Sequence, residues 1–245
     1  MSDTLSARPS SEPRLKTTGP FASDIKGRNL IEDAIGAVQN TAPSANLIDV
    51  ILTKNIPVSA GLGGGSANAA AALRALKHVN EHNINWDRLA RMLSADVPVC
   101  MESKAAWVGG FGDKITKLQK PPPFFAVLVN AQAPPPGNKT ARVFSSLNAP
   151  QISHDQHDTL STHDVSWSSL ENATNDLEQA AIKLMPEIET LKSVIKSTSG
   201  CLFARLSGAG PTCFGLYVSK YDATSAATQI KNDQPNWWVE ATALK

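Results

Sequence analysis

Apolar positions along this chain recur with two different periods, and the period of each stretch predicts its secondary structure. Between residues 29 and 38 they fall at the three- and four-residue intervals of a helix that buries one face. Residues 47–52 form a short, mostly apolar run of the kind found in a buried strand. Residues 67–76 are rich in alanine and residues 86–93 repeat the helical interval, so we expect two further helices there.

Proline and glycine residues mark the ends of elements in the middle of the chain. Pro98 predicts that no helix continues through the residues after Asp96, because proline disfavours a helical conformation in the residue before it. Apolar stretches at 105–108 and 115–118 flank a glycine-rich turn and predict a hairpin. Three consecutive prolines at 121–123 predict a domain boundary.

The second half of the chain again mixes the two periods. The expected elements are a strand at 124–129, helices at 170–184 and 187–195, strands at 201–206 and 213–218, a helix at 222–231 and a strand at 237–242. Residues 151–169, rich in Ser, His and Asp, predict an exposed loop, and the polar, proline-containing residues 1–15 predict a disordered tail. We therefore expect an α+β protein with one domain over residues 16–120 and a second over residues 124–245.

A glycine-rich segment joins the strand at 47–52 to the helix at 67–76. It reads Pro57-Val58-Ser59-Ala60-Gly61-Leu62-Gly63-Gly64-Gly65-Ser66-Ala67. Unpaired backbone N–H groups and the helix dipole favour an anion at such a helix start, and glycine lets the backbone approach phosphate oxygens. The segment lacks the lysine of a P-loop and carries Ser66 where the dinucleotide fingerprint requires glycine. We expect a phosphate-binding loop of another kind; a purely structural turn is the alternative.

Composition excludes several classes of partner. The chain has 245 residues, of which 42% are hydrophobic, enough for a globular core. A net charge of +1, with no dense stripe of Lys and Arg, predicts no nucleic-acid partner. No apolar run approaches the length that spans a bilayer, so no membrane association is expected. Three widely spaced cysteines predict no disulfide framework and no metal site, and favour a cytoplasmic location.

Three motifs, in this order, resemble those of the galactose, homoserine, mevalonate and phosphomevalonate kinase superfamily. The glycine-rich segment resembles its ATP-phosphate loop, residues 94–99 resemble the segment that carries its catalytic aspartate, and residues 206–214 resemble its third glycine motif. The resemblance implies a two-domain α+β kinase fold, with an incomplete ribosomal-protein-S5-like N-terminal domain and a ferredoxin-like C-terminal sandwich. It also implies ATP as phosphate donor, together with Mg²⁺.

Within the superfamily, Ala-Asp-Val-Pro-Val at 95–99 resembles one branch in particular. That branch phosphorylates the 2-hydroxyl of 4-diphosphocytidyl-2-C-methyl-D-erythritol in the non-mevalonate isoprenoid pathway, which implies a small-molecule substrate and a monomer or homodimer. Residues 17–21, 175–178 and 237–239 are also similar to it. The family's Lys-x-Asn-Leu and Arg-x-Asp-Gly-Tyr-His patterns do not occur in these 245 residues. The alternatives are another branch, of the homoserine or mevalonate kinase type, and a catalytically silent remnant that binds nucleotide.

The resemblance assigns the reacting groups residue by residue. Asp96 matches the catalytic base that orients and deprotonates the alcohol, a step for which one carboxylate suffices; by position alone it is equally a helix-end aspartate. The hydroxyl of Ser66 matches a ligand of phosphate or Mg²⁺, and its alternative is an ordinary helix N-cap. Lys54, Asn29 and Leu30 match the nucleotide side of the family's site. A solvated lysine and a core leucine are their plainer interpretations.

For the second substrate, Thr140 and Phe144 match residues that contact the cytidine moiety, with the phenylalanine ring stacked on cytosine. The alternative for Phe144 is a core position on a short helix, beside Val143. Gly208-Ala209-Gly210 would bring backbone N–H groups near the transferred phosphate, and a tight turn between two strands is its alternative.

Overall fold

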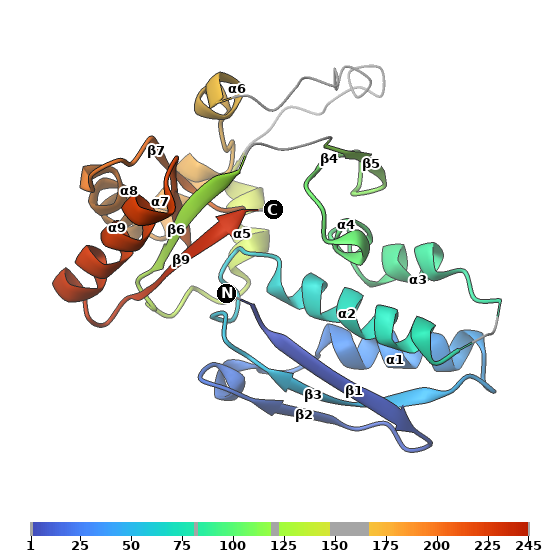
Figure 1. Cartoon of the computed structure of the whole chain (residues 1–245). Helices are drawn as coiled ribbons and strands as arrows, with labels where there is room; N and C mark the ends of the chain where they lie inside the picture. The colour runs from blue at the N-terminus through green and yellow to red at the C-terminus, as the bar shows by residue number, and fades with distance from the viewer. Residues whose placement is uncertain (1, 81–82, 119–122, 148–166, 245) are drawn as a thin grey trace. The chain divides into compact units, whose positions relative to one another are not determined.

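The computed structural model describes residues 2–80, 83–118, 123–147 and 167–244, and the described residues fall into two units (Figure 1). The N-terminal unit comprises Ser2–Val58 and Gly63–Leu118. The C-terminal unit comprises the described residues between 123 and 244 together with the short segment Ser59–Leu62. Part of the glycine-rich loop thus belongs, by its contacts, to the unit that is distant in sequence.

The N-terminal unit is a small sheet covered by helices. Strands β1 (Thr4–Ser10), β3 (Leu47–Thr53) and β2 (Leu15–Thr18) lie in that order, with β1 antiparallel and β2 parallel to β3. Helices α1 (Leu30–Thr41) and α2 (Gly64–His78) cover one face of this sheet (Figure 1). The apolar positions of the predicted helices and of the predicted strand all face the same interior, where they form one buried cluster.

Shorter elements complete this unit. A 3₁₀ turn, η1 (Ala22–Asp24), precedes α1, and helices α3 (Trp86–Leu93) and α4 (Val97–Glu102) pack against α1 and α2. The predicted hairpin is formed by β4 (Ala106–Gly109) and β5 (Lys114–Lys117).

The expectation that residues 1–15 form a disordered tail is wrong for the part that becomes β1. Residues 4–10 pair along their whole length with β3, from Thr4 opposite Thr53 to Ser10 opposite Leu47. The strand is mostly exposed and its sequence therefore looks polar, but Leu5 packs against the core of the unit. Pro9 is accommodated because β1 lies at the end of the described strand order, where a missing N–H is tolerated.

Helix α3 ends at Leu93, before Asp96, as expected, but Pro98 belongs to a further helix, α4, that the sequence did not predict. Pro98 lies in the first turn of α4, a position where its missing N–H costs nothing and its fixed φ suits a helix.

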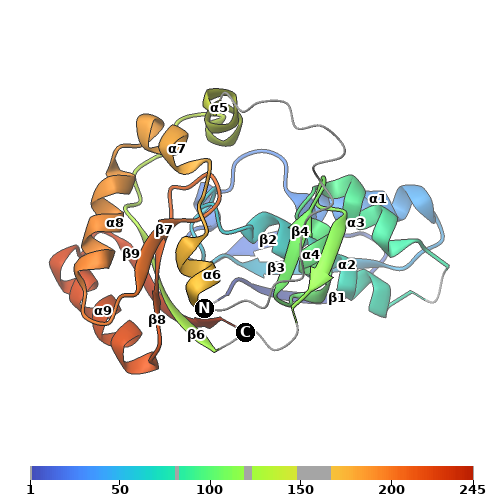
Figure 2. The ribbon, with the colours of Figure 1, turned by 90° about the horizontal axis from the view of Figure 1, so that it is seen from above.

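The C-terminal unit is a four-stranded antiparallel sheet with helices on both faces. Its strands lie in the order β7 (Phe203–Leu206), β8 (Cys213–Tyr217), β6 (Phe124–Asn130) and β9 (Trp238–Leu244). The helices are α5 (Lys139–Ser146), α6 (Trp167–Asn172), α7 (Glu178–Leu184), α8 (Glu187–Ser197) and α9 (Lys220–Asp233). Helices α8 and α9 cover one face and α6 lies against the other (Figure 2).

Strand β6 shows why both faces are covered. Val127 and Val129 point into the cluster formed with the helices α7, α8 and α9, whereas Phe124 and Ala126 belong to the cluster on the opposite face. Successive side chains of a strand alternate between faces, so a continuous apolar run requires two apolar layers.

The single helix expected over 170–184 is two helices, α6 and α7. The chain leaves the helical conformation between them because the Asn175 side chain accepts a hydrogen bond from the backbone N–H of Leu177 (3.1 Å), a local bond that competes with helix. Most of the loop expected at 151–169 lies outside the described residues.

Candidate active site

The glycine-rich loop alternates between ordinary and left-handed backbone. Ser59, Gly61 and Gly63 all have positive φ, at 57°, 79° and 66°. Alternation of this kind turns successive N–H groups toward one side and forms a concave anion site. Glycine was expected at such positions, but Ser59 adopts the left-handed conformation without being glycine, which is uncommon and marks local strain.

Helix α2 begins inside the loop, at Gly64, earlier than the residues 67–76 predict. Its N-cap is Gly63, and among the described residues no side chain caps it. The first backbone N–H with an intrahelical partner is that of Ala67, which donates to the Gly63 carbonyl (2.9 Å). The preceding N–H groups and the helix dipole together form a site suited to phosphate.

Ser66 is therefore not the helix N-cap. It lies in the first turn of α2, nearly buried, and its Oγ is 3.0 Å from the Oγ of Ser94. Ser94 precedes Asp96 by two residues, so this bond ties the start of α2 to the segment that carries the predicted base. Two of the sequence-predicted residues are thereby brought into one neighbourhood of the N-terminal unit.

Asp96 is exposed at the start of α4, where its carboxylate makes no capping hydrogen bond. Its backbone is held by Gly112, which has φ +84° and packs so closely on the Ala95 carbonyl that a side chain at position 112 would overlap it. The end of α4 is fixed by Arg74, whose Nη1 donates to the Cys100 carbonyl (2.8 Å). The sequence predicted a glycine-rich turn at Gly112 but not its contact with the aspartate segment.

Lys54 is not a solvated surface lysine. Its Nζ forms a buried ion pair with Asp3 (2.6 Å), whose side chain is 3% exposed. The same carboxylate accepts hydrogen bonds from the Asn68 amide (2.9 Å) and from the backbone N–H groups of Asn55 (2.8 Å) and Ile56 (3.0 Å). Burial alone would raise the pKa of Asp3, but these hydrogen bonds outweigh it and hold the pKa below its usual value.

The Asp3–Lys54 pair lies directly beneath the glycine-rich loop. It links the beginning of β1, the end of β3 and helix α2, and a Cβ placed on Gly64 would lie 3.5 Å from the Lys54 Nζ. Asp3 was assigned to the tail, and no local pattern could have identified it, because its partners are more than fifty residues away. The pair explains why a strand forms at the start of this chain.

Asn29 and Leu30 lie at the start of α1. The Asn29 side chain caps that helix by accepting from the Ile31 N–H (3.0 Å). Leu30 is half-buried, packs on the core and approaches the first turn of α2, where a Cβ on Gly65 would lie 3.8 Å from its Cδ1. Leu30 therefore adjoins the glycine-rich loop, while Asn29 stabilises the start of α1.

In the C-terminal unit, residues 59–61 of the glycine-rich loop are held by their carbonyl groups. The Ser59 carbonyl accepts from Lys139 Nζ (3.0 Å), the Ala60 carbonyl from the Thr212 N–H (3.2 Å) and the Gly61 carbonyl from Ser207 Oγ (2.8 Å). These donors come from α5 and from the third glycine motif.

Gly61 makes this approach possible. A Cβ there would lie 2.6 Å from the Ser207 carbonyl oxygen and 2.7 Å from that of Gly210. The first and third glycine motifs are consequently in backbone contact, which the sequence spacing alone does not predict.

The third motif is itself supported by residues 175–178. Asn175 donates to the carbonyls of Leu206 (3.1 Å) and Gly208 (2.8 Å), and Glu178 accepts from the Leu206 N–H (3.2 Å) while it pairs with Lys192. In the sequence, residues 175–178 show only a similarity to the family. Their role here is to hold the loop of Gly208, Ala209 and Gly210, in which both glycines have positive φ.

Phe144 is not a core residue. It is 56% exposed on α5, whereas its neighbour Val143 is fully buried. Phe144 lines a shallow depression together with Asn175, Ser207 and Gly208. Thr140 is exposed one turn earlier on the same helix. The structure thus places the predicted ring-stacking residue beside the third glycine motif.

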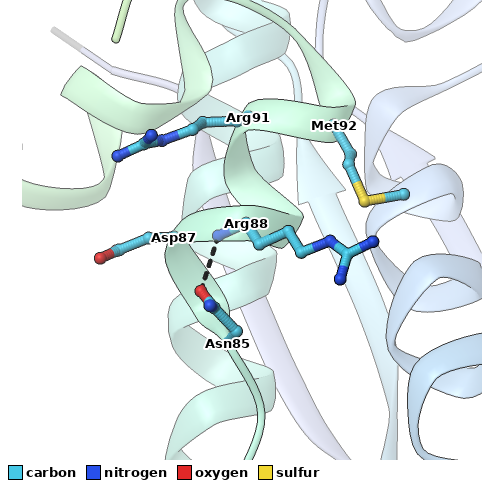
Figure 3. A pocket seen from close by; sticks show the side chains of 5 residues that line it. All are labelled: Asn85, Asp87, Arg88, Arg91 and Met92. Carbon is cyan, nitrogen blue, oxygen red and sulfur yellow. Dashed lines mark hydrogen bonds between the residues drawn. The ribbon is translucent and has the colours of Figure 1, made fainter. Parts of the chain in front are cut away.

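A separate depression lies on α3, away from these groups (Figure 3). Arg88 and Arg91 extend from it to opposite sides, and the only hydrogen bond drawn among its lining residues joins the Arg88 N–H to the Asn85 side chain (2.9 Å), which caps α3. It contains none of the predicted site residues.

Within the described parts of the chain, no three His, Cys, Asp or Glu side chains are grouped so that they would hold a metal ion. Burial raises the pKa of Cys213 to about 12, so this thiol is not a reactive group at neutral pH. Among the described helices, none has both the length and the apolar character needed to cross a membrane.

Comparison with known proteins defines the class. The chain matches the GHMP kinases N terminal domain over residues 29–110 and the GHMP kinases C terminal domain over residues 165–236. The glycine-rich loop and Asp96 fall in the first match and the third glycine motif in the second. The fold and the site together define a small-molecule kinase of the GHMP class, and the expected α+β two-domain fold is confirmed.

Relatives narrow the class to one family. A 4-diphosphocytidyl-2-C-methyl-D-erythritol kinase of Parvibaculum lavamentivorans is 39% identical over 252 residues, covering 98% of this chain and 85% of that protein. The enzyme of the same name from Roseobacter denitrificans is 34% identical, covering 99% of this chain and 81% of that protein. The chain belongs to the 4-diphosphocytidyl-2-C-methyl-D-erythritol kinase family, as its motifs predict.

Solved structures agree with this assignment. A crystal structure of 4-(cytidine 5'-diphospho)-2C-methyl-D-erythritol kinase superimposes with a TM-score of 0.75 at 27% identity, covering 99% of this chain and 86% of that chain. A homoserine kinase from Cytophaga hutchinsonii has a TM-score of 0.73 at 19% identity, covering 99% of this chain and 85% of that chain. The second likeness shows the shared fold alone.

Proposed function

We propose that this protein transfers the γ-phosphoryl group of ATP to the 2-hydroxyl of 4-diphosphocytidyl-2-C-methyl-D-erythritol. The observation that carries the proposal is the pairing, in the N-terminal unit, of an uncapped helix start at Gly64 with the exposed carboxylate of Asp96, tied together by the Ser66–Ser94 hydrogen bond. Family membership supplies the identity of the substrate.

Asp96 is the group proposed to act on the alcohol. Its carboxylate accepts the hydroxyl proton as the substrate oxygen forms a bond to the γ-phosphorus, while the bond from phosphorus to the bridging oxygen breaks and ADP leaves. The transition state is loose and negatively charged, so positioning and electrostatic stabilisation supply most of the rate. Asp96 is exposed and makes no capping hydrogen bond to the described residues, which leaves its carboxylate available for this role.

The N–H groups at the start of α2 would hold the triphosphate. Mg²⁺ is bound by hard oxygen ligands and usually retains several waters and phosphate oxygens. The described residues fit that mode, because the Ser66 hydroxyl is the oxygen group available in the first turn of α2 and no carboxylate cage is present among them. The ion would neutralise phosphate charge.

On the cytidine side, Phe144 is proposed to stack on the cytosine ring and Thr140 to contact the same moiety. The exposure of Phe144 supports this role, because an aromatic ring with half its surface free is available to a planar ligand. The backbone of Gly208-Ala209-Gly210 is proposed to approach the transferred phosphate.

The test is ADP release by the purified chain with Mg²⁺, ATP and 4-diphosphocytidyl-2-C-methyl-D-erythritol. Asp96→Asn should lower kcat by roughly 10²- to 10⁴-fold, the usual contribution of a positioned general base. Asp87→Asn is the matched control, since Asp87 is an exposed aspartate of the neighbouring helix α3 and should leave the rate unchanged.

Homoserine and mevalonate serve as competing substrates. Turnover with either of them, and none with the cytidine compound, would assign the chain to another branch of the superfamily. Equal rates for wild type and Asp96→Asn would exclude Asp96 as the base.

A further inference from the structure

Lys139 is a buried cation without a carboxylate partner among the described residues. It lies at the first position of α5, is 6% exposed, and donates from Nζ to the carbonyls of Ser59 and Gly210. Lysine is almost never buried unless its charge is compensated. Burial lowers the pKa of Lys139 to about 8, which measures how poorly the surroundings replace water.

Both acceptors belong to glycine motifs that the sequence links to phosphate. Ser59 is in the first motif and Gly210 in the third, and each has a left-handed backbone, at φ 57° and 74°. An ammonium group carries three donors and no acceptor. Lys139 therefore joins the two loops with two of its donors and places a positive charge where their backbones meet.

The hydrogen bond from Lys139 holds Ser59, whose backbone is strained. A serine at positive φ persists only where its surroundings impose that conformation. Of the three carbonyls that anchor residues 59–61, the one at the strained residue is held by the lysine, and the other two are held by Thr212 and Ser207.

We propose that Lys139 is a positioning residue that clamps residues 59–61 of the glycine-rich loop to the third glycine motif, both in the C-terminal unit, and supplies positive charge for a nucleotide phosphate bound at that junction. An uncompensated buried charge disfavours the folded chain in isolation, whereas a bound phosphate would provide the missing counterion. The nucleotide part of this proposal rests on the proposed function; the clamp part does not.

The clamp is tested by hydrogen–deuterium exchange, followed in peptides that cover residues 59–62 and 207–212. Lys139→Met keeps the length of the side chain and removes its donors, and it should speed exchange in both segments by at least fivefold while β6 stays protected. Lys139→Arg, which keeps the charge, should restore part of the protection.

Two control variants separate the clamp from general destabilisation. Lys196→Met removes an exposed lysine of the same unit that also donates to a carbonyl, that of Leu202 (2.6 Å), and should leave both segments unchanged. Val143→Ala opens a cavity beneath α5 and should speed exchange throughout the unit, β6 included. A Lys139→Met profile equal to that of wild type, or to the uniform profile of Val143→Ala, would overturn the proposal.

The nucleotide part is tested by kinetics on the same variants. Lys139→Met should raise KM for ATP about tenfold with kcat within threefold of wild type, and Lys139→Arg should recover most of the loss. If Lys139→Met does not fold, Lys139→Leu takes its place in both experiments, because its side chain likewise has no donor and no charge. An unchanged KM for ATP in Lys139→Met would overturn the electrostatic role of Lys139. An inactive wild type would contradict the proposed function, and the hydrogen–deuterium exchange result would then decide the clamp alone.

Discussion

Two lysines, one in each unit, are buried beside segments of the glycine-rich loop, and they differ in the groups that compensate their charge. Lys54 is paired with the carboxylate of Asp3 at 2.6 Å, and that carboxylate accepts three further hydrogen bonds. Lys139 binds only carbonyl groups among the residues that the structure describes. The difference distinguishes a cation whose counterion is built into the fold from one whose counterion has to arrive with a ligand.

The distinction has an energetic meaning. Removing one member of a buried ion pair leaves the other charge uncompensated in a poor solvent, so the pair is structurally indispensable. A buried charge held by carbonyl dipoles alone is retained at a cost, and such groups concentrate at functional sites. We therefore expect the first lysine's network to govern stability and the second lysine to govern nucleotide binding.

The largest expected effect is on the Asp3–Lys54 pair. Asp3→Ala should lower the free energy of unfolding by about 3–5 kcal/mol, because the Lys54 charge is left buried without a partner. Urea denaturation measures this loss. Asp49→Ala, which breaks the exposed pair with Arg8, is the control and should cost much less. Similar losses of unfolding free energy in the two variants would contradict the expected difference between the buried and the exposed ion pair.

Gly61→Ala should be the next most damaging change. Its Cβ would come within 2.7 Å of two backbone carbonyl oxygens, so the two glycine motifs must separate. We expect a loss of about 1–3 kcal/mol in stability and at least a tenfold loss in kcat/KM for ATP, by backbone strain and misplaced phosphate ligands. Gly137→Ala, where a Cβ meets nothing within 4 Å, should be silent in the same assays.

The pH dependence of stability should separate the two networks. Because the folded-state pKa of Lys139 is lowered to about 8 from an ordinary value near 10.5, the unfolded chain binds more protons between these values. Stability should therefore rise with pH from about 8 to about 10.5, by roughly 3 kcal/mol, and Lys139→Met should abolish the rise.

Asp3 should change stability in the same direction but at the acid end of the pH range. Its pKa is held below the ordinary 3.8, so its stabilisation is present above that pH and is lost as the pH falls through the folded-state pKa. Asp3→Asn should remove this acid-side loss and leave the alkaline rise intact. The free energy of unfolding should be measured from pH 2 to pH 10.5 for both variants. A change of the alkaline rise in Asp3→Asn, or of the acid loss in Lys139→Met, would contradict these assignments.

The smallest effect on stability should come from Phe144→Ala. The ring is half exposed, so the free energy of unfolding should change by less than about 0.5 kcal/mol. Loss of stacking should raise KM for the cytidine substrate about three- to tenfold, with KM for ATP unchanged. Tyr221→Ala removes a more exposed aromatic ring on α9 and should change neither constant. A Phe144 variant equal to that control would remove Phe144 from the cytidine site.

Local pattern was sufficient where the stabilising contacts are local. The helix after Asn29, the strand at 47–53, the hairpin at 106–117 and the strands of the second half follow from periodicity and turn residues, and the boundaries differ by only a few residues. A phosphate loop and a catalytic role for Asp96 could be predicted because their motifs are short and contiguous.

Long-range contacts account for what the sequence did not reveal. Strand β1 is polar because it is mostly exposed, and it exists because it pairs with β3 and because Asp3 finds partners more than fifty residues away. Lys139 carried no signal, since nothing near it in sequence shows that it will be buried between two glycine motifs. The break between α6 and α7 likewise depends on Asn175, whose amide binds carbonyls some thirty residues further on.

Calorimetric titration of the purified chain with Mg²⁺ and ATP tests the main proposal, that the glycine-rich loop binds nucleotide. The account predicts saturable binding with one nucleotide per chain, preserved in Asp96→Asn and weakened about tenfold in Lys139→Met. A folded chain that takes up no nucleotide, or that binds it equally well after Lys139→Met and Gly61→Ala, would contradict the account.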